Sequence, residues 1–131
     1  MQQDLRRKII SDFPLCYPRY VSIDVGDGWL NLVYETSYKL EEVIKKANLE
    51  IVEPPEDDDL FYFSSFEVIQ VKSKYAGLRI YMSTETEEMS KIIEEAELKA
   101  STMCEDCGEK GQIAKNHGWL TILCNLHDKE V

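Results

Sequence analysis

The sequence predicts an α+β fold: a small antiparallel β-sheet packed with about three helices, and a structural zinc knuckle at the C-terminus. Three observations support this prediction. Apolar residues recur at steps of three and four in three segments, β-branched and aromatic residues dominate the middle of the chain, and Cys-x₂-Cys and Cys-x₂-His half-sites lie near its end. We expect one domain over residues 1–131, with the knuckle at 101–131 as an integral part of it.

Two helices are expected in the N-terminal part of the chain. The first is predicted over residues 4–12, where apolar side chains recur at helical spacing and Pro14 follows. Residues 20–23 are a candidate short strand. Asp27 is predicted to be the N-cap of a second helix that ends near residue 48. Its apolar stripe consists of Leu30, Val33, Tyr34, Ser37, Leu40, Ile44 and Ala47.

The strongest strand signals lie in the middle of the chain, at residues 61–63, 66–72 and 78–82, and the last two are predicted to form a hairpin. The strand at 66–72 carries apolar residues on both alternating faces, so we expect it to be central and covered on both sides, at least in its first half. A third helix follows, with Thr84 and Glu87 as a capping box. Its buried stripe is Met89, Ile92, Ile93, Ala96, Ala100 and Met103.

Two half-sites near the C-terminus have the spacing of a tetrahedral zinc site. Cys104 and Cys107 form the first, and Cys124 and His127 form the second. The residues between them can form one short hairpin, and Gly108 suits the sharp turn that directs backbone N–H groups at the thiolates. Because protein side chains fill all four positions, the predicted Zn²⁺ is structural. Ordinary thiols or two disulfides are the alternatives, and disulfides fit poorly with an N-terminus that lacks a signal peptide.

Composition and charge limit the classes of partner. The formal net charge is −10, and most of it falls within residues 51–100. This balance disfavours a nucleic-acid partner, because nucleic-acid binding relies on neutralising phosphates. An acidic surface suits a basic protein partner or polyanion mimicry, or it simply keeps the chain soluble. No apolar run approaches the ~18 residues of a membrane span, so we expect no membrane partner. The first seven residues lack the apolar segment of a signal peptide, so we expect a cytoplasmic location. The remaining cysteine, Cys16, is expected to be buried as a small apolar residue.

Four segments together resemble a family of small, uncharacterised proteins encoded by bacteria and their phages. They are residues 26–29 (Gly-Asp-Gly-Trp), the hairpin at 70–81, residues 96–101, and the knuckle at 104–127. The chain departs from the family pattern at Ala76, where the family has a glycine-richer turn, and in the acidic residues 53–59. The resemblance implies the zinc site and an origin in a bacterium or a phage-infected host cell. The resemblance does not point to any catalytic activity.

Two groups of residues are candidate binding sites. The hairpin places Lys72, Lys74, Tyr75 and Arg79 close together in an acidic neighbourhood. These side chains can hold a phosphate or a partner carboxylate, with Arg79 able to make a bidentate contact. Alternatively, the cations neutralise Glu67 and the acidic loop as surface ion pairs. The second group is the acidic loop itself, with Asp57, Asp58 and Asp59.

These observations favour a non-enzymatic, zinc-stabilised protein-binding module, a bacterial or phage accessory protein that engages or inhibits a host factor. The alternative is a nucleic-acid-associated regulator that uses the basic hairpin and the knuckle. A metal-dependent nuclease would need Glu67, Gln70 and Lys72 with the acidic loop. Glu67 and Lys72 lie on opposite faces of a regular strand, which opposes that hypothesis. Trp29 and Trp119 are expected in the core, and His117 is a loop residue or an alternative metal ligand to His127.

Overall fold

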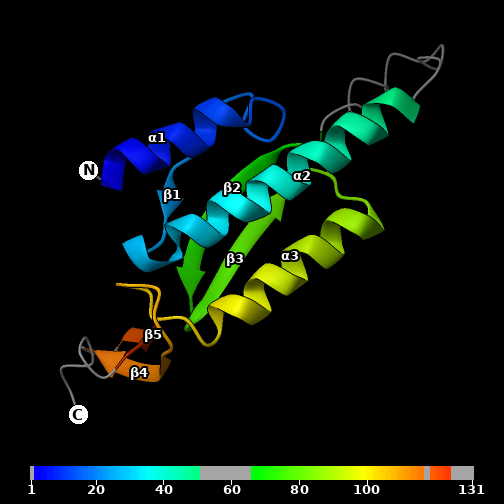
Figure 1. Cartoon of the computed structure of the whole chain (residues 1–131). Helices are drawn as coiled ribbons and strands as arrows, with labels where there is room; N and C mark the ends of the chain where they lie inside the picture. Colours follow the sequence, from blue (N-terminus) through cyan, green and yellow to red (C-terminus); the bar gives the residue numbers. More distant parts are fainter. Residues whose placement is uncertain (1, 51–65, 117–118, 125–131) are drawn as a thin grey trace.

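The computed structural model describes residues 2–50, 66–116 and 119–124. It confirms the α+β class, with helices, a three-stranded sheet and a separate two-stranded sheet (Figure 1). The predicted strand at residues 61–63 lies outside the described residues. In chain order, the elements are α1 (Gln2–Asp12), β1 (Ile23–Asp24), the 3₁₀ helix η1 (Asp27–Trp29), α2 (Leu30–Glu50), β2 (Val68–Lys74), β3 (Gly77–Met82), α3 (Glu87–Ala100), β4 (Gln112–Asn116) and β5 (Trp119–Leu123).

The larger sheet has the strand order β1-β2-β3, so the prediction that β2 is the central strand is confirmed. β2 and β3 form the expected antiparallel hairpin, closed by a turn in which Tyr75 and Ala76 both have positive φ. The two-residue β1 pairs with β2 in parallel, which makes this sheet mixed. β4 and β5 form the second sheet, and this is the hairpin expected between the two half-sites.

All three α-helices lie on one side of the larger sheet, where α2 crosses β2 and β3 (Figure 1). Val68 and Val71 of β2 and Leu78 and Ile80 of β3 are buried on that side. The prediction that β2 is covered on both faces is wrong, because Ile69 is 53% exposed. A bulge between Val68 and Gln70 interrupts the regular alternation, so Val68 and Val71 both turn inward.

The buried surface of α2 is wider than the predicted stripe. Leu32, Thr36 and Glu41 are also buried, because α1 and the segment after it pack beside α2. The ring of Phe13 meets the ring of Tyr34 at 4.9 Å between centroids. A helix with neighbours on two sides needs a broader apolar surface than one that covers a sheet alone.

Two of the predicted helix starts differ from the structure. The N-cap of α3 is Thr86, whose hydroxyl accepts a hydrogen bond from the Met89 N–H at 3.2 Å, and the proposed capping box at Thr84 is therefore wrong. Asp27 does not cap the second helix but forms an ion pair with Arg6 at 3.1 Å.

None of the helices in the described part of the chain is long and apolar enough to cross a membrane.

Candidate functional site

Three of the four predicted metal ligands lie together beside the C-terminal β4–β5 hairpin. The sulfur atoms of Cys104, Cys107 and Cys124 lie within 4.8 Å of one another. Cys107 Sγ and Cys124 Sγ are 3.7 Å apart, whereas a disulfide bond is about 2.05 Å long. Two thiolates bound at about 2.3 Å to a tetrahedral zinc ion lie about 3.8 Å apart. The three sulfurs therefore fit a tetrahedral metal ion, and His127, the predicted fourth ligand, lies outside the described residues.

The first half-site is a tight turn with its own hydrogen bonds. The Gly108 N–H donates to the Cys104 carbonyl at 2.8 Å, and the Cys104 N–H donates to the Glu109 carbonyl at 2.6 Å. Gly108 has φ +84°, a left-handed conformation that side chains other than glycine rarely adopt. The turn thus confirms the expectation for Gly108. It also brings the Glu109 N–H to the Cys107 sulfur.

The thiols influence one another's ionisation. The Glu109 N–H lowers the pKa of Cys107, but desolvation and the neighbouring Cys104 and Cys124 thiols outweigh it and raise this pKa to about 11. Adjacent thiolates repel one another, so the first to ionise makes the next harder to ionise. A divalent cation between them reverses this balance, because it stabilises the thiolate forms that bind it.

Glu105, the residue after Cys104, connects the knuckle to the rest of the protein, although no local pattern in the sequence marks it. One carboxylate oxygen accepts a hydrogen bond from the Gly26 N–H at 2.9 Å. The other accepts from Ser73 Oγ of β2 at 2.9 Å and from Thr121 Oγ1 of β5 at 2.7 Å. A single side chain therefore joins the loop before η1, the larger sheet and the knuckle hairpin.

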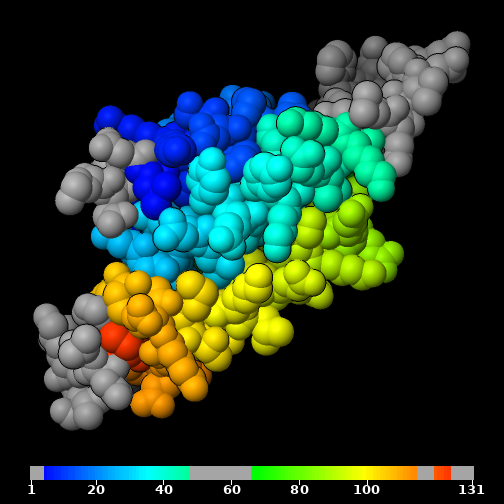
Figure 2. Space-filling model, in the orientation of Figure 1, coloured from blue at the N-terminus to red at the C-terminus, as the bar shows by residue number. Residues whose placement is uncertain are grey.

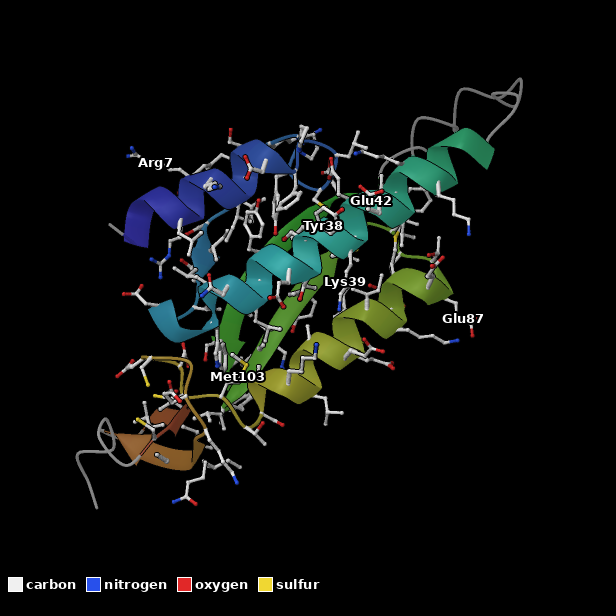
Figure 3. All side chains as sticks on the ribbon, viewed as in Figure 1. Arg7, Tyr38, Lys39, Glu42, Glu87 and Met103 are labelled. Atoms are coloured by element: carbon white, nitrogen blue, oxygen red, sulfur yellow. The ribbon has the colours of Figure 1, made fainter. Side chains whose placement is uncertain are left out.

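The loop at residues 26–28 packs directly against the first half-site. The Gly28 N–H donates to the Glu105 carbonyl at 2.7 Å. A Cβ atom added at Gly28 would lie 2.3 Å from the Cys104 carbonyl oxygen, so only glycine allows this approach. Trp29 is fully buried, as expected, and its indole N–H donates to the Met103 carbonyl at 2.8 Å. Figure 3 labels Met103 at this junction.

Two segments of the family resemblance, residues 26–29 and the Cys104–Gly108 turn, are thus in direct contact. Figure 2 shows the knuckle atoms, in orange, lying against the start of α2 and the end of α3. The hairpin tip adds a third contact, since the Ala76 N–H donates to the Leu120 carbonyl of β5 at 3.2 Å. The cysteine cluster is therefore held against the body through backbone contacts on several sides.

The face of the larger sheet opposite the helices carries the predicted basic residues. We define the open sheet face as Ile69, Gln70, Lys72, Lys74, Arg79 and Tyr81, with Tyr75 at the hairpin tip. Alternation with the buried Val71, Leu78 and Ile80 places the side chains that follow the bulge on the side away from the helices, and Ile69, at the bulge, is 53% exposed. Tyr75 is 73% exposed and Tyr81 41% exposed. Two lysine side chains lie over tyrosine rings, Lys72 over Tyr81 at 5.8 Å and Lys74 over Tyr75 at 5.4 Å.

The predicted alternative pairs the cations of this face with Glu67 and with the acidic loop. Burial raises the pKa of Glu97 on α3, and Arg79 lies close enough to that carboxyl to oppose the rise. Among the described residues, ion pairs join Arg6 to Asp27, Lys45 to Glu42 and Lys91 to Glu87. Lys72, Lys74 and Arg79 belong to none of these ion pairs. The acidic candidates Asp57, Asp58 and Asp59 lie outside the described residues, and so does His117.

A second polar cluster lies between α1 and α2 and serves packing. The buried carboxylate of Glu41 accepts hydrogen bonds from the backbone N–H groups of Leu15, at 3.0 Å, and Cys16, at 2.9 Å. Burial raises the pKa of the Cys16 thiol, with Glu41 adding to the rise. The protonated thiol donates to the Ser37 carbonyl at 3.4 Å. Cys16 is therefore buried as expected, but it is a hydrogen-bonded member of a polar cluster.

The fold and the site define a small α+β protein with a cysteine cluster of the metal-binding kind at its C-terminal end. In comparisons with known proteins, no family model, no curated protein and no solved structure matches the chain.

Proposed function

We propose that the chain is a zinc-stabilised, non-enzymatic binding module whose open sheet face contacts another protein. The resemblance to proteins of bacteria and phages suggests the setting, an accessory protein that engages or inhibits a host factor. Zinc is the metal that best suits a closed site of three thiolates and one imidazole in a knuckle of this spacing. Its role in the proposal is to hold the C-terminal part in place, since a fully ligated ion has no position for substrate.

The observation that carries the proposal is the gathering of exposed tyrosine and cationic side chains on one sheet face. Tyrosine and arginine are enriched in protein interfaces, because they combine a large apolar area with a polar end. The hairpin tip contacts β5 of the knuckle through the Ala76–Leu120 hydrogen bond, and the Leu120 side chain is 40% exposed. Exposed apolar area on neighbouring elements supports a continuous contact surface.

A capture experiment tests this proposal. The tagged full-length protein, loaded with zinc, is used to isolate partners from a bacterial host lysate with and without nuclease, and mass spectrometry identifies them. We expect a stoichiometric protein partner that survives nuclease and is lost when Tyr75 and Tyr81 are replaced by alanine. Tyr20→Ala is the matched control, because Tyr20 is 81% exposed and lies outside the open sheet face. A partner that both tyrosine variants retain would remove the open sheet face from the proposal.

A nucleic-acid-associated regulator is the second candidate, favoured by the three cations on one sheet face. It predicts binding of an oligonucleotide that weakens steeply with salt, and partners that disappear after nuclease treatment. The bulge in β2 removes the objection that Glu67 and Lys72 must lie on opposite faces. The nuclease hypothesis nevertheless also needs the acidic loop, which lies outside the described residues.

A further inference from the structure

We propose that the open sheet face binds a short, extended acidic segment of the partner protein, with carboxylates at alternate positions. This inference rests on the proposed function and adds the chemistry of the partner. The face is a small cationic area in a chain with a net charge of −10. Charge complementarity therefore selects a ligand whose negative charge is confined to the area that the face covers.

The spacing of the cations fits an extended chain. Lys72 and Arg79 are direct cross-strand partners, and Lys74 lies two residues further along β2, opposite Gly77. Side chains two residues apart on one strand are separated by about 6.6 Å. Carboxylates at positions i and i+2 of an extended segment have the same separation. One carboxylate can therefore meet the Lys72–Arg79 pair, where arginine offers a bidentate contact, while the next meets Lys74.

The tyrosines distinguish between carboxylate and nucleobase ligands. Nonspecific single-strand binding relies on aromatic rings whose faces are free to stack on bases. Here the Lys72 ammonium lies over the Tyr81 ring at 5.8 Å, and the Lys74 ammonium lies over the Tyr75 ring at 5.4 Å. A base can stack on that side of either ring only by displacing a lysine, whereas a carboxylate can bind the same lysine where it already lies.

Acidic residues on both lateral edges of the face limit the width of the ligand. Asp24 of β1 is exposed and is the cross-strand partner of Lys72. On the opposite edge, a groove of about 420 Å³ between β3 and α3 includes Glu85, Glu94 and Glu97 in its lining. A polyanion broader than a single extended chain would lie over these carboxylates and be repelled. A single extended segment that runs along β2 and β3 keeps its carboxylates between these two edges and avoids that repulsion.

Fluorescence anisotropy with the zinc-loaded full-length protein tests the inference. The probe is a fluorescein-labelled dodecapeptide with glutamate at three alternate central positions and threonine elsewhere. Its controls are the same peptide with glutamine in place of glutamate and a labelled oligothymidylate of twelve nucleotides. We expect the glutamate peptide to bind at least about tenfold more tightly than either control, since one charge-assisted contact is worth about that factor.

Matched variants locate the contact. Lys72→Glu and Arg79→Glu are each expected to weaken binding of the glutamate peptide at least about tenfold, and the neutral Lys72→Gln to weaken it less. Lys91→Glu changes the net charge equally but lies on α3, where Lys91 pairs with Glu87, and it should leave binding within about twofold. Circular dichroism of each variant verifies that the fold is retained.

Three results would overturn the inference. These are no binding of the glutamate peptide, an equal loss of binding with Lys91→Glu, or tighter binding of the oligothymidylate than of the peptide. The last result would assign the face to nucleic acid.

The capture experiment separates this inference from the proposed function. A protein partner lost with the tyrosine variants but retained by Lys72→Glu leaves the open sheet face as the contact surface and rejects only the acidic partner.

Discussion

The Glu105 carboxylate links parts of the protein that are far apart in the chain. It accepts hydrogen bonds from a backbone N–H and two hydroxyl groups, and its own backbone carbonyl accepts from the Gly28 N–H. Hydrogen bonds to charged groups stabilise more than neutral ones, and partly buried donors that lose their acceptor also lose stability. Much of the attachment of the knuckle to the body therefore depends on this residue.

Replacing Glu105 by alanine should consequently lower the free energy of unfolding by about 3 kcal/mol, because three donors lose a charged acceptor. Asp106→Ala is the matched control: Asp106 is exposed, carries the same charge and lies in the same turn. Its effect should stay within about 0.5 kcal/mol. Urea denaturation of both zinc-loaded variants gives the comparison. Equal effects of the two substitutions would contradict the role assigned to Glu105.

The cysteine spacing could be recognised from the sequence, and the Glu105 tether could not. Ligands of one half-site are three positions apart, so the turn that joins them is a local property of the sequence. The partners of Glu105, by contrast, are Gly26, Ser73 and Thr121, which lie 79, 32 and 16 residues away. The packing of three separate elements determines which carboxylate accepts hydrogen bonds from these three donors.

At the scale of structural elements, η1 packs directly against the cysteine turn of the knuckle. The Gly28 position has no room for a side chain, since a Cβ atom there would lie 2.4 Å from the Gly108 nitrogen and 2.6 Å from the Cys107 nitrogen. These are backbone atoms of the cysteine turn and cannot move without changing its shape. The position of the candidate metal ligands therefore depends on an element that precedes them by about 75 residues.

Gly28→Ala should for that reason lower stability by more than about 3 kcal/mol and also weaken zinc binding. The matched substitution is Gly77→Ala in β3, where the nearest atom to an added Cβ is 3.3 Å away. That change should cost less than about 1 kcal/mol and leave zinc binding unaltered. Thermal unfolding and competition with a chromogenic zinc chelator measure the two effects. A Gly28→Ala protein with normal zinc affinity would contradict the proposed coupling.

Glu97, which lines the groove between β3 and α3, makes the stability of the protein depend on pH. Partial burial raises the pKa of Glu97, Arg79 opposes this rise, and Glu94 and Glu85 add to it. Because folding raises this pKa, Glu97 contributes fully to stability when the pH is below its pKa in the unfolded state. This contribution is lost as the pH rises through its pKa in the folded state. The ionised carboxylate therefore lowers stability at neutral pH.

Glu97→Gln should accordingly raise the free energy of unfolding at pH 7, by less than about 1 kcal/mol after screening by solvent. The gain should shrink as the pH is lowered from 7 to 5. Within this range, protons do not yet compete strongly with a metal ion for the thiolates. Glu95→Gln removes the same charge on the exposed side of α3 and controls for net charge. A gain that is constant over this pH range would contradict the assignment.

Element types could be predicted from the sequence better than their ends and faces. The apolar stripe of α3 was predicted correctly at Met89, Ile93, Ala96 and Ala100, because helical spacing depends only on local order. The cap moved from Thr84 to Thr86, since both threonines offer the same hydroxyl and packing selects between them. The faces of β2 were misassigned because one bulged residue reverses the parity of every residue beyond it.

For the entire chain, metal binding and folding are expected to be one process. A structural zinc ion contributes about 10–16 kcal/mol in small domains, against a total stability of about 5–15 kcal/mol for a typical protein. The knuckle contacts η1, β2 and the end of α3, so its loss would expose the buried Trp29 and free the hairpin tip. We therefore expect zinc to stabilise the open sheet face as well as the knuckle.

The deciding measurement is the metal content of the full-length protein purified without added metal, determined by elemental analysis and native mass spectrometry. We expect one zinc ion per chain, retained by His117→Asn and bound about 100-fold more weakly by His127→Asn, because a lost ligand removes roughly a quarter of the binding free energy. A folded protein without bound metal, or one with a Cys107–Cys124 disulfide, would contradict the zinc-stabilised module.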